Sequence, residues 1–201
     1  LNPQERRDFF VEMFEDVLTT LLAVPELEQV AVATVCPIAG KIAKKYGTSV
    51  LFTEKDEGQT AAVTRTAEIL ESKRVAKMLM LPGDVPLVTV EEIQTVIATH
   101  ENACSTPDVP AMTIVPARDE QGSNCIVLSP PTAAPLRFGP NSYFPHLETA
   151  RKLGVSLQTL KLPGIGLDID TPEDLLELGR QSVQTRAQNY LQKYKILERI
   201  K

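Results

Sequence analysis

Two aspartates near the end of the chain have no evident role in local structure. In the stretch "LPGIGLDIDTPEDL", Thr171 and Pro172 are typical of a helix start, and they leave Asp168 and Asp170 unexplained. Side chains two residues apart on an extended segment point to the same side, so these carboxylates would repel each other unless a positive charge lay between them. The spacing therefore indicates a site for a cation.

A third carboxylate follows an apolar run of strand length. Asp84 comes after "AKMLMLP", in the turn-rich sequence "PGDVP". Aspartate is common in turns, so a turn role for Asp84 taken alone is an open alternative. Ligands of α/β folds bind beyond the carboxyl ends of strands, and hard oxygen ligands suit Mg²⁺. Together, Asp84, Asp168 and Asp170 predict a magnesium site.

Two further stretches could contact an anion. The loop "EQGSN" is either a plain hairpin turn or an anion contact through the hydroxyl of Ser123 and nearby backbone N–H groups. In "RFGPNSYFPHLETA", Ser142 is placed as the N-cap of a helix, and a helix start binds anions. Gly139 just before it would let a phosphate approach the backbone closely.

The histidines and the known nucleotide motifs add little chemistry. His146 is expected to pack on its helix rather than act as a ligand, and His100 to be a favourable cation at a helix end rather than a catalyst. The sequence has no nucleophile elbow, no Walker loop and no dinucleotide fingerprint. A reaction that needs only positioning and metal electrostatics matches this pattern better than nucleophilic catalysis.

The elements that must position these residues alternate between helix and strand. Helical periodicity is expected over 2–23, 38–46, up to 72, over 90–100 and up to 153, and strands over "QVAVATV", "TSVLF", "AKMLMLP", "AMTIVP", "NCIVLS" and "SLQTLKL". This order predicts one α/β domain over 1–201, with a mainly parallel central sheet flanked by helices. A helical tail over 182–201 would pack on the body or on a second subunit in a homodimer.

Composition excludes several classes of protein. A chain of 201 residues with 43% hydrophobic content can bury one sizeable core. Its net charge is −5 and it has no basic run, so we expect it to bind neither nucleic acid nor a membrane surface. Cys36, Cys104 and Cys125 suggest neither disulfides nor zinc, and are expected to be buried thiols. With no apolar run of ~20 residues and no signal-peptide pattern, a cytoplasmic location is expected.

Four ordered motifs carry a family resemblance. The motifs "LPGDVPLVT", "GSNCIVLSPP", "FGPNSYFPHLETARKLG" and "LDIDTPEDL" make the chain resemble the 2-phospho-L-lactate guanylyltransferase family of coenzyme F-420 biosynthesis. The resemblance implies a GT-A-like nucleotidyltransferase fold of the nucleotide-diphospho-sugar transferase kind. It also implies Mg²⁺-dependent transfer of GMP from GTP to 2-phospho-L-lactate, phosphoenolpyruvate or 3-phosphoglycerate, with release of pyrophosphate.

The same resemblance assigns roles to residues. The three aspartates match the positions that hold Mg²⁺, and Ser123, Gly139 and Ser142 match those that hold the acid substrate. Nucleotide contacts are expected at Gly58 and Thr60, where Thr60 stands at a position that is usually Asn. The family's first strand and phosphate-binding loop would lie upstream of the first residue.

Two other functions remain open from the sequence. Another nucleotidyltransferase of the same fold, of the molybdenum-cofactor or sugar-phosphate type, would keep the acidic site but should not need "FGPNS" and "GSN" together. A non-catalytic nucleotide-binding module would have no reason to keep three acidic positions.

Overall fold

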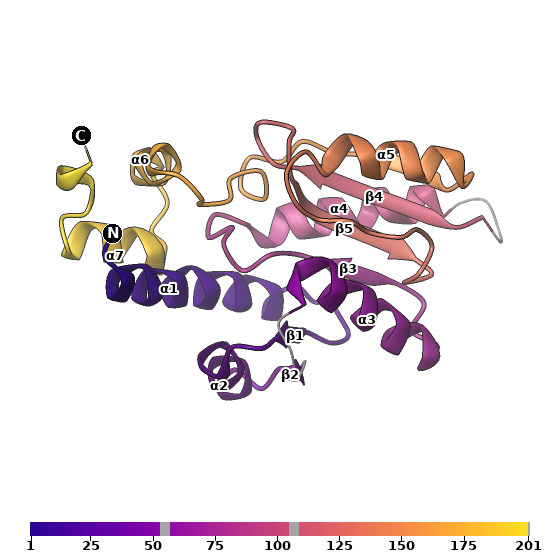
Figure 1. The fold of residues 1–201 in the computed structure, drawn as a ribbon, viewed down its shortest axis with the longest axis horizontal. Helices are drawn as coiled ribbons and strands as arrows, with labels where there is room; N and C mark the ends of the chain where they lie inside the picture. The colour runs from indigo at the N-terminus through magenta and orange to yellow at the C-terminus, as the bar shows by residue number, and fades with distance from the viewer. Residues whose placement is uncertain (53–56, 105–108, 201) are drawn as a thin grey trace.

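The computed structural model describes residues 1–52, 57–104 and 109–200 as alternating helices and strands (Figure 1). The part of the predicted polar stretch "EKDEGQT" that falls on 54–56 lies outside the described residues. The helices are α1 (Pro3–Leu22), α2 (Pro37–Lys45), α3 (Gly58–Ser72), α4 (Val90–Ala103), α5 (Tyr143–Lys152), α6 (Pro172–Arg180), α7 (Arg186–Lys193) and the short 3₁₀ helix η1 (Leu197–Arg199). The strands are β1 (Ala31–Thr34), β2 (Ser49–Phe52), β3 (Met78–Met80), β4 (Ala111–Pro116), β5 (Ser123–Ser129) and β6 (Ser156–Thr159).

The main sheet has four strands in the order β3-β5-β4-β6. Strand β5 runs antiparallel to both β3 and β4, whereas β4 and β6 are parallel. A separate pair, β1 and β2, is parallel. The predicted α/β class is confirmed, but the sheet is mixed rather than mainly parallel. The reason is that β4 and β5 are joined by the short loop 117–122, which suits a hairpin and is too short for a parallel crossover.

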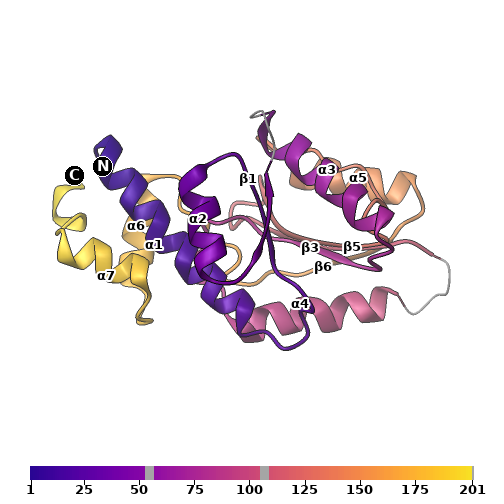
Figure 2. The ribbon, with the colours of Figure 1, turned by 90° about the horizontal axis from the view of Figure 1, so that it is seen from below.

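Helices cover both faces of this sheet. Figure 2 shows α3 and α5 on one side of the strands and α4 on the other. Successive strand residues point to opposite faces, so Ile126 packs with the α3 and α5 side while Cys125 and Val127 pack with α4 and α1. Because both faces are covered, β4 is buried along its whole length. The carboxyl end of β3 and the hairpin loop are thereby held on a rigid base.

The first helix and the chain end pack together. The side chain of Asn2 caps α1 by accepting from the N–H of Glu5 at 2.9 Å, and Glu5 returns the bond, which confirms the predicted helix start. The buried side of α1 meets Tyr190 of α7 in one apolar cluster. Asp16 of α1 accepts from the first N–H groups of α7, and Figure 1 shows the two termini close together. The helical tail therefore packs on the body of the same chain, and the homodimer stays a prediction.

His100 differs from its predicted role as a helix-end cation. It is buried at the end of α4, between the hydroxyls of Thr113 at 3.0 Å and Ser129 at 2.7 Å. Burial lowers the pKa of His100 to about 4, with a smaller effect from the nearby positive charge of Lys77. His100 is therefore neutral at pH 7 and serves as a buried polar link between α4 and the strands.

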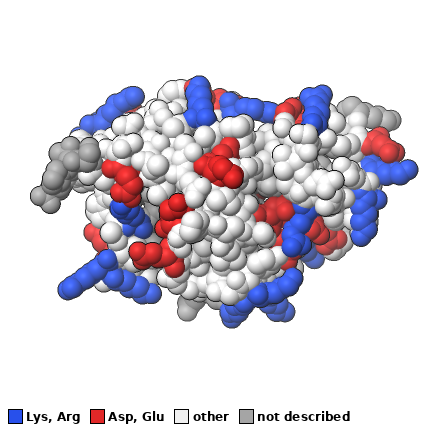
Figure 3. Space-filling model, turned by 180° about the vertical axis from the view of Figure 1, so that it is seen from behind, with Lys and Arg blue, Asp and Glu red and all other residues white. Residues whose placement is uncertain are grey.

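The surface also differs in part from expectation. Cys36 is exposed and Cys104 is half-buried, so the prediction of buried thiols holds only for Cys125, whose pKa burial raises to about 12. Basic and acidic side chains are interspersed over the face in Figure 3. None of the helices in the described part of the chain is long and apolar enough to cross a membrane.

Candidate active site

A cavity of about 720 Å³ opens where β3 ends and the β4–β5 hairpin turns. The segments before α5 and α6 form its other walls. It is lined by six of the eight residues singled out by the sequence: Asp84, Ser123, Gly139, Ser142, Asp168 and Asp170. Gly58 and Thr60 do not line it, although their neighbour Gln59 does. The structure therefore brings together the predicted metal and acid-substrate positions, and leaves the two predicted nucleotide positions outside the cavity wall.

The aspartates meet because the turn after β3 and the segment before α6 are joined by a backbone hydrogen bond. The N–H of Ile169 donates to the carbonyl of Asp84 at 3.1 Å, which places Asp168 and Asp170 on either side of that junction. Burial, followed by repulsion from Asp170 and then Asp168, raises the pKa of Asp84 to about 6. In addition, Oδ1 of Asp84 is buried without a hydrogen-bond partner. Negative charge is therefore concentrated at this place in the cavity.

Asp168 is held by a residue that the sequence analysis did not single out. Asn124, at the start of β5, donates from Nδ2 to Oδ1 of Asp168 at 3.0 Å and to the carbonyl of Ile165 at 2.9 Å. Asn124 is itself buried. Its signal in the sequence was a polar amide directly before the apolar run of β5. The amide fixes one oxygen of Asp168 and leaves the other available to a ligand.

The segment before Asp168 is held from the other side by Glu92. This buried carboxylate of α4 accepts from the N–H of Gly164 at 2.7 Å and of Ile165 at 3.1 Å. A Cβ at position 164 would lie 2.3 Å from the carbonyl oxygen of Leu87, so only glycine fits. Backbone and side-chain contacts thus fix the path of the chain as it reaches the aspartates.

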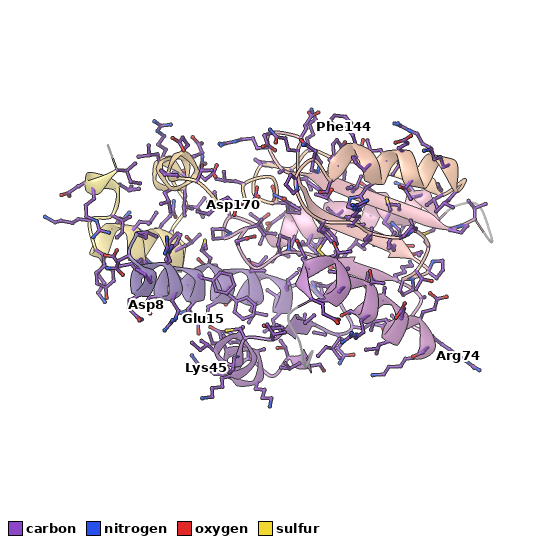
Figure 4. The ribbon with its side chains drawn as sticks, viewed as in Figure 1. Asp8, Glu15, Lys45, Arg74, Phe144 and Asp170 are labelled. Carbon is purple, nitrogen blue, oxygen red and sulfur yellow. The ribbon has the colours of Figure 1, made fainter. Side chains whose placement is uncertain are left out.

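The start of α6 confirms the predicted cap and adds a positive charge. Thr171 and Asp174 form a reciprocal capping box, with Pro172 in the first turn. Asp174 also accepts a bond from the guanidinium of Arg118 at 3.1 Å. Among the described residues that line the cavity, Arg118 alone is a lysine or arginine. Figure 4 places Asp170 in the segment that leads into this helix.

A second part of the cavity wall, here called the serine wall, consists of Ser123 and Ser142, which are held in place by His146. Ser142 precedes α5, but its side chain does not cap the helix as predicted; its hydroxyl donates to Oγ of Ser123 at 3.3 Å. Nδ1 of His146 lies 3.0 Å from the same Oγ, and Nε2 accepts from the N–H of Arg137 at 2.8 Å. Burial lowers the pKa of His146 to about 4, so the ring is neutral at pH 7. As predicted, His146 packs on its helix, and it also orders the serine wall.

Thr60 does not line the cavity but is hydrogen-bonded to a residue that does. Its hydroxyl oxygen accepts from the N–H of Phe138 at 2.9 Å, and Phe138 lines the cavity. The next residue, Gly139, has a φ of +130°, a conformation that residues with a side chain rarely adopt. The nucleotide contacts at Gly58 and Thr60 remain predictions, and the contact that Thr60 makes is with Phe138, next to the predicted acid-substrate position Gly139.

The acidic wall has the donor set for a hard divalent cation. Within the described ranges, no three His, Cys, Asp or Glu side chains are close enough together to form a ready-made metal site. The orphaned Oδ1 of Asp84 and the repulsion among the aspartates are nevertheless what a cation would relieve. Carboxylate oxygens are ligands that Mg²⁺ accepts while keeping several waters. The carboxylates are therefore ligands of the kind that suit Mg²⁺, and the magnesium site at Asp84, Asp168 and Asp170 stays a prediction.

Comparison with known proteins points to one family. A family model described as guanylyl transferase CofC like matches residues 1–200. The chain is 29% identical to the phosphoenolpyruvate guanylyltransferase of Conexibacter woesei, over 85% of this chain and 74% of that protein. It is 29% identical to the 3-phospho-D-glycerate guanylyltransferase of Colwellia psychrerythraea, over 87% and 80% of the two chains. It is 28% identical to the 2-phospho-L-lactate guanylyltransferase of Methanothermobacter thermautotrophicus, over 96% and 81%.

A solved structure shows the same fold. A putative nucleotide-diphospho-sugar transferase from Desulfovibrio desulfuricans G20 superposes with a TM-score of 0.75 at 15% sequence identity, covering 99% of this chain and 87% of that one. This similarity confirms the predicted nucleotide-diphospho-sugar transferase-like fold, and at this identity it carries the fold alone.

Proposed function

Because the chain belongs to the family described as guanylyl transferase CofC like, we propose that it transfers GMP from GTP to a small phosphorylated three-carbon acid and releases pyrophosphate. The chain is an enzyme of the nucleotidyltransferase kind. The observation that carries the proposal is that two sets of side chains line one cavity. Ser123, with the Ser142 hydroxyl bonded to it, belongs to one set, and the carboxylates of Asp84, Asp168 and Asp170 form the other.

The serine wall suits the acid. Phosphoenolpyruvate, 3-phosphoglycerate and 2-phospho-L-lactate each carry one phosphate and one carboxylate, so each needs hydrogen-bond donors on one side of the cavity. Hydroxyl donors and backbone N–H groups near a glycine are suited to such oxygens. Gly139, with its positive φ, lets the backbone approach a phosphate where a side chain would block it. The names of the relatives limit the acceptor to these three acids as first candidates.

The acidic wall suits the nucleotide phosphates only if a cation lies between them. Asp84, Asp168 and Asp170 would hold Mg²⁺, which when bound supplies positive charge against the phosphate oxygens. Asn124 keeps Asp168 oriented, and the backbone bond from Ile169 to Asp84 keeps the aspartates at one place. The acceptor phosphate is already an anion at neutral pH, so the chain needs no general base to activate it. The residues act by holding and orienting two anions.

The product would be a guanylylated three-carbon acid, the precursor of the deazaflavin coenzyme F-420. The proposal has four further parts. One of the three acids is the acceptor, GTP is preferred over other nucleoside triphosphates, the protein is cytoplasmic, and it forms a homodimer. A discriminating assay for the first two uses pyrophosphate release with Mg²⁺, each of the three acids and each nucleoside triphosphate in turn. Release that requires both GTP and one acid supports the proposal and names the acceptor.

Variants of the acidic wall test the proposed role of its residues. Asp84→Asn and Asp168→Asn should each lower turnover by at least 100-fold, since removing a group that stabilises transition-state charge costs about that much. Asp8→Asn, on the exposed side of α1, is the matched control and should retain full activity (Figure 4). A folded protein that releases no pyrophosphate with any acid and any nucleotide would refute the proposed function. Full activity in both acidic-wall variants would refute the proposed cation site.

A further inference from the structure

The proton on His146 has a defined position. Nε2 of the ring lies 2.8 Å from the backbone nitrogen of Arg137, and a backbone N–H can only donate. Nε2 must therefore be the bare, accepting nitrogen. The ring is 1% exposed, and burial keeps it neutral by lowering its pKa to about 4. A neutral imidazole carries one proton, so that proton is on Nδ1.

This tautomer determines what the Ser123 hydroxyl can do. Nδ1–H of His146 donates to Oγ of Ser123 at 3.0 Å, and the hydroxyl of Ser142 donates to the same oxygen at 3.3 Å. A serine hydroxyl has two accepting lone pairs and one donating O–H. Both lone pairs are taken by protein donors, so the capacity that remains is the O–H itself. Ser123 lines the cavity, and its proton is free to point into it.

We propose that His146 is a positioning residue that makes the Ser123 hydroxyl a one-way hydrogen-bond donor to an anionic oxygen of the acceptor acid. This inference rests on the proposed function, since it assigns the occupant of that part of the cavity. The group bound at Ser123 is an oxygen that only accepts, in a phosphate or a carboxylate, and not a substrate hydroxyl acting as donor. The ring acts through hydrogen-bond direction and adds no charge of its own.

The network also explains why the wall needs a histidine there. One ring must accept from the backbone of the segment before α5 and donate to β5, and its two nitrogens do both at once. The ring also packs edge-on against Phe138, with centroids 5.5 Å apart. A purely structural role for His146 would need only this packing and the bond from the backbone N–H of Arg137. The experiment must therefore separate loss of packing from loss of the bond to Ser123.

Amide side chains separate the two bonds, and a double-mutant cycle tests whether they act through Ser123. His146→Asn can place its amide near the Nδ1 position and keep the donor to Ser123, whereas His146→Gln reaches the Nε2 position and loses that donor. Ser123→Ala removes the hydroxyl. We expect Ser123→Ala and His146→Gln each to raise the KM for the acid roughly 10- to 100-fold, the range for one hydrogen bond to a charged group. The KM for GTP should stay within about twofold, and His146→Asn should recover part of the loss.

The double variant decides the outcome. If His146 acts through Ser123, His146→Gln in the Ser123→Ala background causes no further rise in the KM for the acid. Two independent effects that multiply, or an equal rise in the KM for GTP, would overturn the inference in favour of a structural role. All four variants are first compared with the wild-type protein by thermal unfolding, so that only folded proteins enter the comparison.

A second measurement does not depend on activity. Long-range ¹H–¹⁵N spectra of the wild-type protein report which ring nitrogen of each histidine carries the proton. The chain has two histidines, so a His100→Gln variant assigns the signals. We expect Nδ1 of His146 to be protonated at pH 7, and a proton on Nε2 would overturn the inference even in an active enzyme. A wild-type protein inactive with every acid would instead refute the proposed function, which keeps the two failures apart.

Discussion

Replacing Asp84 by Asn should make the cation-free protein more stable while abolishing its activity. Oδ1 of Asp84 is buried without a hydrogen-bond partner, and the carboxylate is repelled by Asp170 and Asp168. The backbone bond from Ile169 to residue 84 does not depend on the side chain, so the contact between the turn after β3 and the segment before α6 survives the substitution. An amide of the same shape removes the charge. The substitution therefore removes an unfavourable interaction that the folded protein keeps for binding.

The magnitude follows from the charge, because the substituted amide would still lack a hydrogen-bond partner. The pKa of Asp84 is raised from 3.8 to about 6, and each pKa unit corresponds to about 1.4 kcal/mol against the ionised form. We expect the free energy of unfolding of Asp84→Asn to rise by about 1–3 kcal/mol in the presence of a chelator. For a chain of this size that corresponds to a Tm increase of roughly 2–12 °C. Calorimetry and chemical denaturation in buffer with EDTA measure both quantities.

With Mg²⁺ added, the wild-type protein should become more stable than Asp84→Asn. A ligand that binds only the folded state stabilises it by about 2.7 kcal/mol at a concentration of one hundred times its Kd. Wild-type protein should gain stability with Mg²⁺, and Asp84→Asn should gain much less. The control Asp8→Asn changes an exposed carboxylate on α1 and should match the wild type in both buffers, within about 0.5 kcal/mol. A loss of stability in Asp84→Asn without cations, or an equal response of both proteins to Mg²⁺, would refute this reasoning.

Three further predictions concern stability and the elements that hold the site. Glu92→Gln should lower the free energy of unfolding by about 1–3 kcal/mol, because an amide cannot accept from both N–H groups that the carboxylate now satisfies; Glu91→Gln next to it is exposed and should change little in the same denaturation assay. Gly164→Ala should lower the free energy of unfolding by about 3 kcal/mol or more, since its Cβ would lie 2.3 Å from the carbonyl oxygen of Leu87. At roughly 2–4 °C per kcal/mol, a Tm within about 2 °C of the wild type would contradict this clash. His100 has its folded pKa lowered to about 4 while the unfolded value is 6.5, so the unfolded chain binds more protons between these values and stability falls as the pH drops from 6.5 towards 4. Relative to His100→Gln, the wild-type free energy of unfolding should fall by an additional 1.4 kcal/mol or so per pH unit, and equal slopes would show that His100 is charged in the folded state.

Local signals in the sequence predicted much of the fold. The start of α6 was predicted from Thr171 and Pro172 and that of α1 from helical periodicity over 2–23, because both signals depend on residues close together in the sequence. Apolar runs of strand length gave the strands. Their direction was not predictable in the same way, since β4 and β5 are buried on both faces and read like parallel strands. Only the short loop 117–122 distinguished the hairpin, and the sequence analysis left that reading open.

Some residues of the candidate site could be predicted from the sequence and others could not. Asp168 and Asp170 were visible because the helix start at Thr171 and Pro172 leaves them unexplained, and Asp84 because it follows an apolar run of strand length. Asn124 and Glu92 were not visible as parts of the site, because each acts on a segment far away in the sequence. Their partners depend on how the strands and helices pack, which is a property of tertiary structure.

The buried polar side chains around the site make their hydrogen bonds, whereas one oxygen at its centre does not. Glu92, Asn124 and His146 each use two hydrogen-bonding atoms or two bonds to fix a wall of the cavity, and all three are buried. In the described part of the chain, Oδ1 of Asp84 is the one buried side-chain oxygen or nitrogen without a partner. The hydrogen bonds of the surrounding side chains are made, while Oδ1 of Asp84 has none. The unfavourable free energy of a buried, unpaired carboxylate is therefore located where a cation would bind. The rigidity of the two walls is what keeps the aspartates from moving apart to relieve their repulsion.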